Sequence, residues 1–172
     1  MGIITPMTRA PALFLLLLTL AACGFRPLYG ESARPAEQLL ASVAIENIED
    51  RSGQQLRLLL TDRFYSTAPQ TSTKYRLAVR YVASKTELGI RRDDVATRAR
   101  LALTGYFTLT PMDGSEPFSG SERSFVSYNI LLDPYATGAA EQNATERGLT
   151  QLADNMTNRI ALYLAGLEKR NP

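Results

Sequence analysis

Three stretches of alternating apolar and polar residues constrain the fold of this chain more than any other feature. They cover residues 74–85, 97–110 and about 119–128. Because successive side chains of a β-strand point to opposite faces, each stretch is typical of a strand with one buried and one solvated face, which favours antiparallel pairing. Polar turns at residues 89–94 and at Asp113-Gly114 separate the stretches. The sequence therefore predicts three consecutive antiparallel strands.

Two segments have the spacing of amphipathic helices. The first covers residues 54–66 and follows a turn in which Asp50 or Ser52 offers an N-cap. The second runs from about residue 133 or 135 to residue 166 and carries a broad apolar stripe. The stripe consists of Leu149, Leu152, Ala153, Met156, Ile160, Tyr163, Leu164 and Leu167.

A fourth strand is expected at residues 42–48, where Val43 and Ile45 alternate with Ala44, Glu46 and Ile48. The order of elements is then strand, helix, three strands, helix. Since amphipathic helices bury their apolar side against another element, the sequence predicts an α+β fold with two helices packed on one face of a four-stranded, mostly antiparallel sheet. Residues 38–172 are expected to form this single domain.

Residues 1–22 have the pattern of a signal peptide. Arg9 and the terminal amine are positive, and the apolar run at 12–20 is shorter than the roughly 20 residues that span a bilayer. The run ends in Leu20-Ala21-Ala22-Cys23, which resembles a lipobox. Cys23 is the one cysteine of the chain, so it has no internal disulfide partner. We expect Cys23 to be lipidated and to anchor the protein; the alternative is an ordinary signal peptide with a coincidental cysteine.

Residues 23–37 are expected to be a tether, because Pro27, Gly30 and Pro35 interrupt any periodicity. The residue after Cys23 is Gly24. In lipoproteins of Gram-negative bacteria an aspartate at this position favours retention at the inner membrane. Gly24 therefore indicates an outer-membrane location.

The composition excludes several kinds of chemistry. Histidine is absent, which excludes Ser-His-Asp and Cys-His nucleophiles, and with a single cysteine also a zinc site with nitrogen and sulfur ligands. Paired carboxylates such as Asp93 and Asp94 remain, but most acids fall in turns or on solvated sides of strands. Gly114, Gly120 and Gly138 are interpreted as turn residues. With a net charge of only +2, we expect no nucleic-acid partner. The residues indicate no cofactor and no metal site.

Arginines gather on the solvated side of the predicted sheet. Two arginines lie on each of two successive strands and two more in the turn between them, so all six would lie close together if the strands form a hairpin. Lys85 would lie nearby, and Asp93 and Asp94 would reduce the positive charge locally. Guanidinium groups bind phosphate through two hydrogen bonds. The surface is therefore either an anion-binding site or an ordinary solvated face. The residues are Arg76, Arg80, Arg91, Arg92, Arg98 and Arg100.

Two parts of the chain resemble one known family. The first is the expected mature start, Cys23-Gly24-Phe25-Arg26-Pro27-Leu28-Tyr29. The second is a set of C-terminal segments: Ser127-Tyr128-Asn129, Asp133-Pro134-Tyr135-Ala136, Ala140-Glu141-Gln142-Asn143-Ala144 and Ile160-Ala161-Leu162-Tyr163-Leu164. Together they resemble the LptE family of lipopolysaccharide-assembly lipoproteins, in its alphaproteobacterial branch. The middle of the chain is similar in pattern more than in residues.

The resemblance implies a non-catalytic outer-membrane lipoprotein with two helices on a four-stranded sheet. It implies that the domain plugs the β-barrel partner LptD and binds lipopolysaccharide for assembly into the outer leaflet. The six arginines are the expected ligand residues on charge geometry alone, because the family motif does not map onto them residue by residue. The alternatives are an accessory lipoprotein of another envelope lipid-transport system and, more distantly, a carboxylate-based envelope hydrolase.

Overall fold

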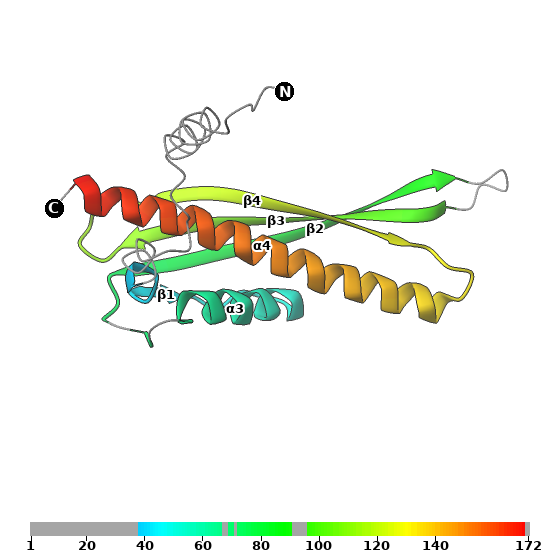
Figure 1. Ribbon diagram of the computed structural model, residues 1–172, viewed down its shortest axis with the longest axis horizontal. Coiled ribbons are helices and arrows are strands. Elements are labelled where there is room, and N and C mark those ends of the chain that lie inside the picture. Colours follow the sequence, from blue (N-terminus) through cyan, green and yellow to red (C-terminus); the bar gives the residue numbers. More distant parts are fainter. Residues whose placement is uncertain (1–37, 67–68, 71, 91–95, 171–172) are drawn as a thin grey trace, which may run out of the picture. The chain divides into compact units, whose positions relative to one another are not determined.

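Four strands form one mixed sheet in the order β1-β2-β3-β4 (Figure 1). They are β1 (Val43–Ile45), β2 (Tyr75–Ile90), β3 (Ala96–Pro111) and β4 (Phe118–Asn129). β2, β3 and β4 pair antiparallel, as predicted, whereas β1 runs parallel to β2. A parallel pair needs a crossover connection, and helix α3 (Arg51–Phe64) lies in it.

The structure is a computed structural model that describes residues 38–66, 69–70, 72–90 and 96–170. Residues 38–40 are helical, and α4 (Pro134–Arg170) forms the long C-terminal helix. Within these ranges, no helix is both long and apolar enough to cross a membrane. The predicted signal peptide, Cys23 and the tether lie outside the described residues.

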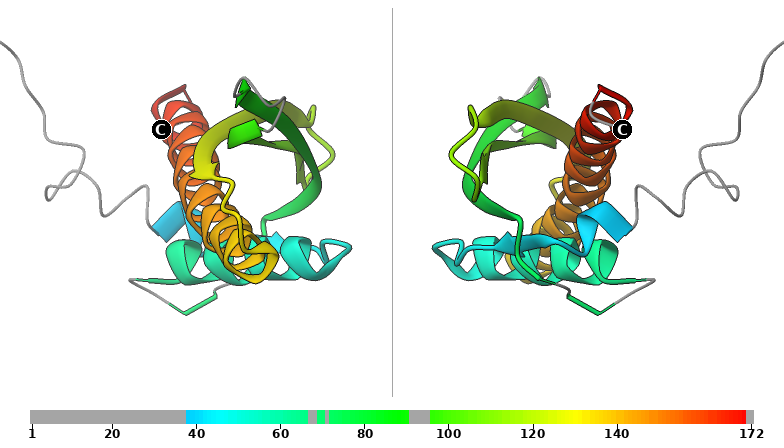
Figure 2. Two further views of the ribbon diagram at one scale, coloured as in Figure 1. Left: turned by 90° about the vertical axis from the view of Figure 1, so that its right-hand side faces the viewer. Right: turned by 90° about the vertical axis from the view of Figure 1, so that its left-hand side faces the viewer.

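The α+β class and the four strands are as predicted, but the packing of both helices on one face of the sheet is not confirmed. The sheet is curved, α4 packs along β3 and β4, and α3 contacts α4 and the short β1 (Figure 2). Because β1 is only three residues long, it gives α3 little sheet surface to cover. The buried residues Leu56, Leu60 and Phe64 of α3 therefore complete the core largely beside α4.

The core fills the space between α4 and one face of the sheet, here called the inner face. Leu103 of β3 is fully buried there, as are Leu152 and Met156 of α4. A Cβ atom on Gly148 of α4 would lie 2.5 Å from Leu103 Cδ1, and one on Gly105 of β3 would lie 2.9 Å from Met156 Sδ. The absence of a side chain at these positions lets helix and sheet approach closely, which fixes the position of α4 on the strands.

Several predicted boundaries differ from the observed ones. β1 ends at Ile45, so Ile48 does not continue its alternation; it is buried against Gly53 of α3. α3 begins at Arg51, and the side chain of Asp50 makes no capping hydrogen bond. Of the three glycines interpreted as turn residues, Gly114 has a φ of 82° in a turn, whereas the other two, Gly120 and Gly138, lie within β4 and α4.

Candidate anion-binding surface

The face of β2, β3 and β4 that points away from α4 is the candidate functional surface, here called the outer face. Pairing places Arg80 opposite Tyr106, and Thr104 opposite Arg123. Leu103 is buried against α4, so its neighbours along β3 point to the opposite side. The outer face therefore consists of the even-numbered residues of β2 and β3 and the odd-numbered residues of β4.

Five exposed arginines lie on the outer face, and no described residue of β2, β3 or β4 places a carboxylate there. The two acids of these strands that pair within the sheet, Glu87 and Glu122, point to the inner side. One nearby acid lies outside these strands: Oε1 of Glu46, which follows β1, lies 3.4 Å from Nε of Arg76. The outer face therefore carries a positive potential along most of its length. The five arginines are Arg76 and Arg80 on β2, Arg98 and Arg100 on β3, and Arg123 on β4.

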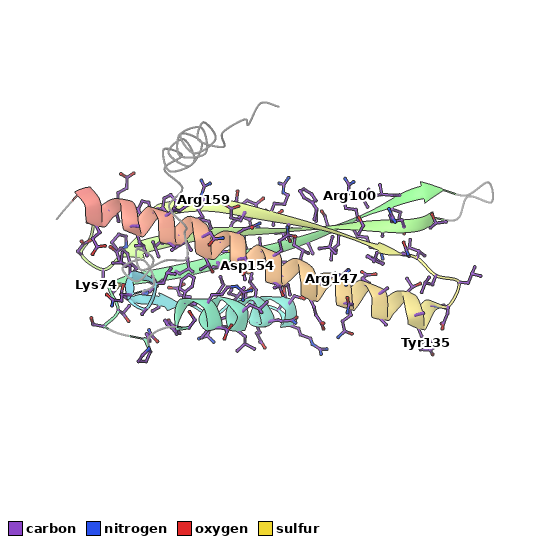
Figure 3. All side chains as sticks on the ribbon, in the orientation of Figure 1. Lys74, Arg100, Tyr135, Arg147, Asp154 and Arg159 are labelled. Atoms are coloured by element: carbon purple, nitrogen blue, oxygen red, sulfur yellow. The ribbon has the colours of Figure 1, made fainter. Side chains whose placement is uncertain are left out.

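The arginines form a stripe and not the compact cluster that the sequence suggested. Arg80 lies opposite Tyr106, which is six residues along β3 from Arg100, or about 20 Å at roughly 3.3 Å per residue. Arg123, opposite Thr104, lies between them. Figure 3 shows Arg100 projecting from the side of the sheet remote from α3. A ligand that contacted the whole stripe would need several separated anionic groups.

Apolar side chains lie among these arginines. Val82, Tyr106 and Phe125 are 42%, 41% and 56% exposed on the outer face. The guanidinium carbon of Arg80 lies 4.7 Å from the centroid of the Tyr106 ring, and that of Arg123 lies 5.9 Å from the Phe125 ring. Cation–π contacts of this kind orient a guanidinium group without neutralising it. The surface therefore offers both fixed positive charge and exposed apolar area.

A groove of about 550 Å³ adjoins the Arg98 end of the stripe, between the end of β4 and α4. Arg98 and Arg147 line it together with the polar residues Ser127, Asn129 and Asn143, and no carboxylate is among its lining residues. Arg147 Nη1 donates a hydrogen bond to Asn143 Oδ1. The volume is within the range of small-ligand sites, and two guanidinium groups with hydroxyl and amide donors suit an anion.

Lys85, expected near the arginines, lies on the inner side instead. Its Nζ lies 2.8 Å from Glu141 Oε2 of α4, and the hydroxyl of the buried Tyr128 donates to the same oxygen at 2.7 Å. The hydrogen bond to Glu141 raises the pKa of Lys85, and the same bond lowers the pKa of Glu141. Burial raises the pKa of the Tyr128 hydroxyl. This network fastens the first turns of α4 to the sheet and faces away from the arginine stripe.

The structure thus places four of the six predicted arginines on one face: Arg76, Arg80, Arg98 and Arg100. The other two, Arg91 and Arg92, lie outside the described residues, as do the turn acids Asp93 and Asp94. Sequence reasoning missed Arg123 and Arg147. Arg123 could have been found by extending the alternation into the third stretch, whereas Arg147 needed the position of α4 relative to β4.

Solved structures from three bacteria share this fold. A protein from Caulobacter crescentus described as a lipoprotein is 24% identical, with a TM-score of 0.62 over 77% of this chain and 98% of that chain. The rare lipoprotein B of Shewanella oneidensis is 15% identical, with a TM-score of 0.58 over 73% and 98% of the two chains. A minor lipoprotein from Acinetobacter baumannii is 19% identical, with a TM-score of 0.53 over 70% and 90%.

A search of curated proteins found no match to this chain. Residues 40–160, however, match the family described as "LptE: Lipopolysaccharide-assembly". The match covers β1 to β4, α3 and most of α4, and therefore well over half of the chain. The chain therefore belongs to the LptE family, a family of non-enzymatic envelope lipoproteins with a role in lipopolysaccharide assembly.

Proposed function

We propose that this protein binds lipopolysaccharide on the outer face of its sheet while the glycolipid is assembled into the outer membrane. The observation that carries the proposal is the outer face itself, where β2, β3 and β4 place five arginines and exposed apolar side chains but no carboxylate, and where Glu46 pairs with Arg76 alone. Lipopolysaccharide combines phosphate groups with acyl chains. A surface that offers guanidinium groups beside apolar area is complementary to both parts of such a molecule.

The spacing of the arginines supports a ligand with more than one anionic group. The groove with Arg98 and Arg147 would hold one phosphate, and Arg80 and Arg123 lie farther along the stripe. Phe125 and Val82 lie in the intervening part of the face and would contact acyl chains. Because the arginines are exposed, salt should screen this binding strongly.

The membership of the family supports a further part of the proposal: a lipid anchor at Cys23 and a plug-like association with the β-barrel LptD. Cys23 would attach the protein to the outer membrane through its acyl chains, with the domain on the periplasmic side or inside the barrel. A tether of roughly a dozen residues at about 3.3–3.6 Å each would hold the domain within reach of a barrel in that membrane.

The binding proposal is tested with the double variant Arg98→Glu/Arg100→Glu in the full-length protein in detergent. Affinity for purified lipopolysaccharide is measured at low and high salt, and circular dichroism checks the fold. The double variant should bind at least tenfold more weakly at low salt, and the difference should shrink at high salt. The control, Arg51→Glu, reverses a charge at an exposed helix position away from the outer face. Equal losses in both variants, or unchanged affinity in the first, would refute the outer face as the ligand surface.

The partner proposal is tested by isolating the lipidated protein from outer membranes. We expect it to copurify with a large β-barrel polypeptide at a fixed ratio. A Cys23→Ala variant should lose membrane attachment. Recovery of the lipidated protein without any barrel would count against the plug role, although it would leave lipopolysaccharide binding open to the direct assay.

A further inference from the structure

The loop that joins β4 to α4 projects large apolar side chains into solvent (Figure 1). Leu132 and Tyr135 are 91% and 90% exposed, and Leu131 is 49% exposed. Figure 3 shows Tyr135 at the end of the molecule where α4 begins, pointing away from the sheet. Single exposed apolar residues are ordinary, but three within five residues form a patch that the fold does not bury. These three residues are here called the apolar tip.

Hydrogen bonds hold the loop of the apolar tip in one shape. The amide of Leu131 donates to Thr137 Oγ1 at 2.9 Å, and the Thr137 hydroxyl donates to the carbonyl of Leu131 at 3.1 Å. Asp133 Oδ1 accepts a hydrogen bond from the amide of Tyr135 at 2.9 Å, which caps the first turn of α4. The tip is therefore presented in a fixed position, so its burial against a partner would cost little conformational entropy in the backbone.

The fold itself does not use the two most exposed side chains of the tip. The last apolar residue of this segment that packs inward is Ile130, which lies against the small core cluster around Tyr128, and its amide donates to the carbonyl of Thr97 at 3.0 Å. Within the described chain, neither Leu132 nor Tyr135 belongs to or packs against a core cluster. Polar residues would serve the loop equally well for folding. The apolar tip therefore points to a partner.

We propose that the apolar tip inserts into an apolar recess of the β-barrel partner and fixes this end of the domain there. The inference rests on the plug role proposed above and adds the part of the surface that anchors the contact. Apolar and aromatic side chains that fill a pocket of the partner supply most of the binding energy of protein interfaces. A projecting tip of fixed shape is complementary to such a pocket.

Charge at the tip favours a protein over a bilayer as the occupant. Residues 124–146 contain three carboxylates and no lysine or arginine, whereas segments that insert into a membrane surface generally carry basic residues beside apolar ones. Asp133 lies within the tip, and no described cation is within ion-pair distance of its carboxylate. A carboxylate in hydrocarbon is costly. The rim of a protein recess can offer Asp133 a hydrogen-bond donor, which the core of a bilayer cannot.

The shape of the tip separates it from the anion-binding surface. Sites for small apolar ligands are concave and bury most of the ligand, whereas Leu132 and Tyr135 project from a loop. The groove with Arg98 and Arg147 is lined by Leu131 but by neither of the other two tip residues. Leu132 and Tyr135 can therefore be changed without altering the groove.

The first test measures how much β-barrel polypeptide copurifies with the full-length, lipidated protein from outer membranes. Leu132→Ser/Tyr135→Ser should lower the recovery about fivefold or more, with an unchanged midpoint of urea unfolding, because the recess loses its apolar anchors. Leu132→Met/Tyr135→Phe keeps the apolar area and should recover the barrel fully. The matched control, Leu58→Ser/Leu162→Ser, makes similar changes at helix residues that are 66% and 61% exposed and should also recover it fully.

Each other outcome of this test has a distinct meaning. Full recovery with the serine variant of the tip, or an equal loss in the control, would overturn the tip as the anchor and leave the plug role standing. Absence of the barrel from the unchanged protein would refute the plug role and the tip contact together. The serine variant of the tip should bind lipopolysaccharide with unchanged affinity; a weakened affinity would reassign the tip to acyl chains.

A second test identifies what the tip touches. A photoreactive benzoylphenylalanine in place of Leu132, in the full-length protein in outer membranes, should form an adduct with the β-barrel polypeptide. An adduct with lipid alone, or no adduct, would overturn the proposal. In the full chain with Cys23→Ser, Asp133→Asn removes the charge of the tip and keeps the capping oxygen. Neither chain should bind vesicles of phosphatidylethanolamine and phosphatidylglycerol; binding that Asp133→Asn strengthens would assign the tip to the bilayer.

Discussion

The two faces of the sheet are built from neighbouring residues of the same strands, yet they differ in almost every physical property. On β3, Leu103 is fully buried against α4, whereas the next residue along, Thr104, lies on the outer face and accepts a hydrogen bond from Arg123 Nε at 3.2 Å. The inner face is mostly apolar, and one of its two acids, Glu122, pairs with Arg159 of α4. On the outer face the three long strands carry five arginines and no acid, and only Arg76 pairs with an acid from outside them, Glu46.

This difference separates what the fold needs from what a ligand would need. Burial of the inner face supplies most of the stabilisation, at roughly 25 cal/mol per Å² of apolar area. Exposed surface substitutions generally change stability by less than about 0.5 kcal/mol. Folding therefore does not require five arginines on the outer face, and it does not explain why β2, β3 and β4 place no carboxylate there. The comparison predicts that changes on one face alter stability and changes on the other alter binding.

The largest expected effect comes from placing a carboxylate on each face at adjacent residues. Leu103→Asp should leave the domain unfolded or destabilised by more than about 4 kcal/mol, because it buries an unpaired charge in the core. Ala102→Asp points to the outer face, where it pairs with Phe125 and has Arg100 nearby, and should change stability by less than about 0.5 kcal/mol. Urea unfolding followed by circular dichroism measures both. Similar losses in the two variants would mean that the face assignment is wrong.

The next effect concerns the close approach of α4 to the inner face. Gly148→Ala should destabilise the protein by about 1–3 kcal/mol, because the new methyl group overlaps Leu103 and touches Val126. Gly138→Ala, in the same helix with nothing within 4 Å, should stabilise by up to about 1 kcal/mol through helix propensity. Opposite signs in thermal or urea unfolding are the expected result. Stabilisation by both changes would show that α4 does not need glycine at its contact with the sheet.

The sequence predicted the two faces well where one period persists over many residues. The alternation in β3 identified Leu101, Leu103, Phe107 and Leu109 as buried, and the helical stripe identified Leu152 and its neighbours. The prediction of the first strand was too long, because no turn residue marks the end of its alternation. β1 ends at Ile45, and Ile48 packs against Gly53 of α3. The parallel direction of β1 and the position of α3 depend on contacts between distant segments, which periodicity does not contain.

For the arginines of the outer face, the sequence predicted the face on which they lie but not their positions relative to one another. Alternation placed Arg76, Arg80, Arg98 and Arg100 on one side, since that depends on local geometry alone. Alternation did not show that the arginines would form a long stripe. Which residues of neighbouring strands lie opposite one another depends on the pairing register, which the sequence pattern does not give. Lys85 was grouped with the arginines by its sequence position, although its parity places it opposite them beside Glu141.

A smaller effect would distinguish the apolar from the charged part of the outer face. Phe125→Ser should change stability by less than about 0.5 kcal/mol, because the ring is 56% exposed. It should weaken binding of lipopolysaccharide a fewfold and leave binding of the deacylated, phosphorylated saccharide unchanged, since only the acylated ligand uses the ring. Titrations of both ligands against the variant measure this. Equal weakening for the two ligands would assign Phe125 to positioning Arg123 instead of contacting acyl chains.

The smallest expected effect lies on the inner side, in the network that fastens α4 to the sheet. Hydrogen bonding to Lys85 lowers the pKa of Glu141, so its contribution to stability is present above the pKa of an unfolded glutamate, about 4.3, and is lost as the pH falls through the lower folded value. Bonding to Glu141 raises the pKa of Lys85, so that contribution is complete below about 10.4 and is lost at higher pH.

Glu141→Gln should therefore reduce the free energy of unfolding at pH 7 by less than about 1 kcal/mol, because both side chains are roughly 40% exposed and solvent screens the pair. The difference from the unchanged protein should shrink as the pH falls below the pKa of an unfolded glutamate and through the lowered pKa of folded Glu141. Glu146→Gln, at an exposed position of the same helix, controls for the loss of a helix carboxylate. A difference that does not shrink with falling pH would mean that the contacts of Glu141 stabilise α4 without its charge. Lipopolysaccharide binding should be the same for both variants, because the outer face is unchanged.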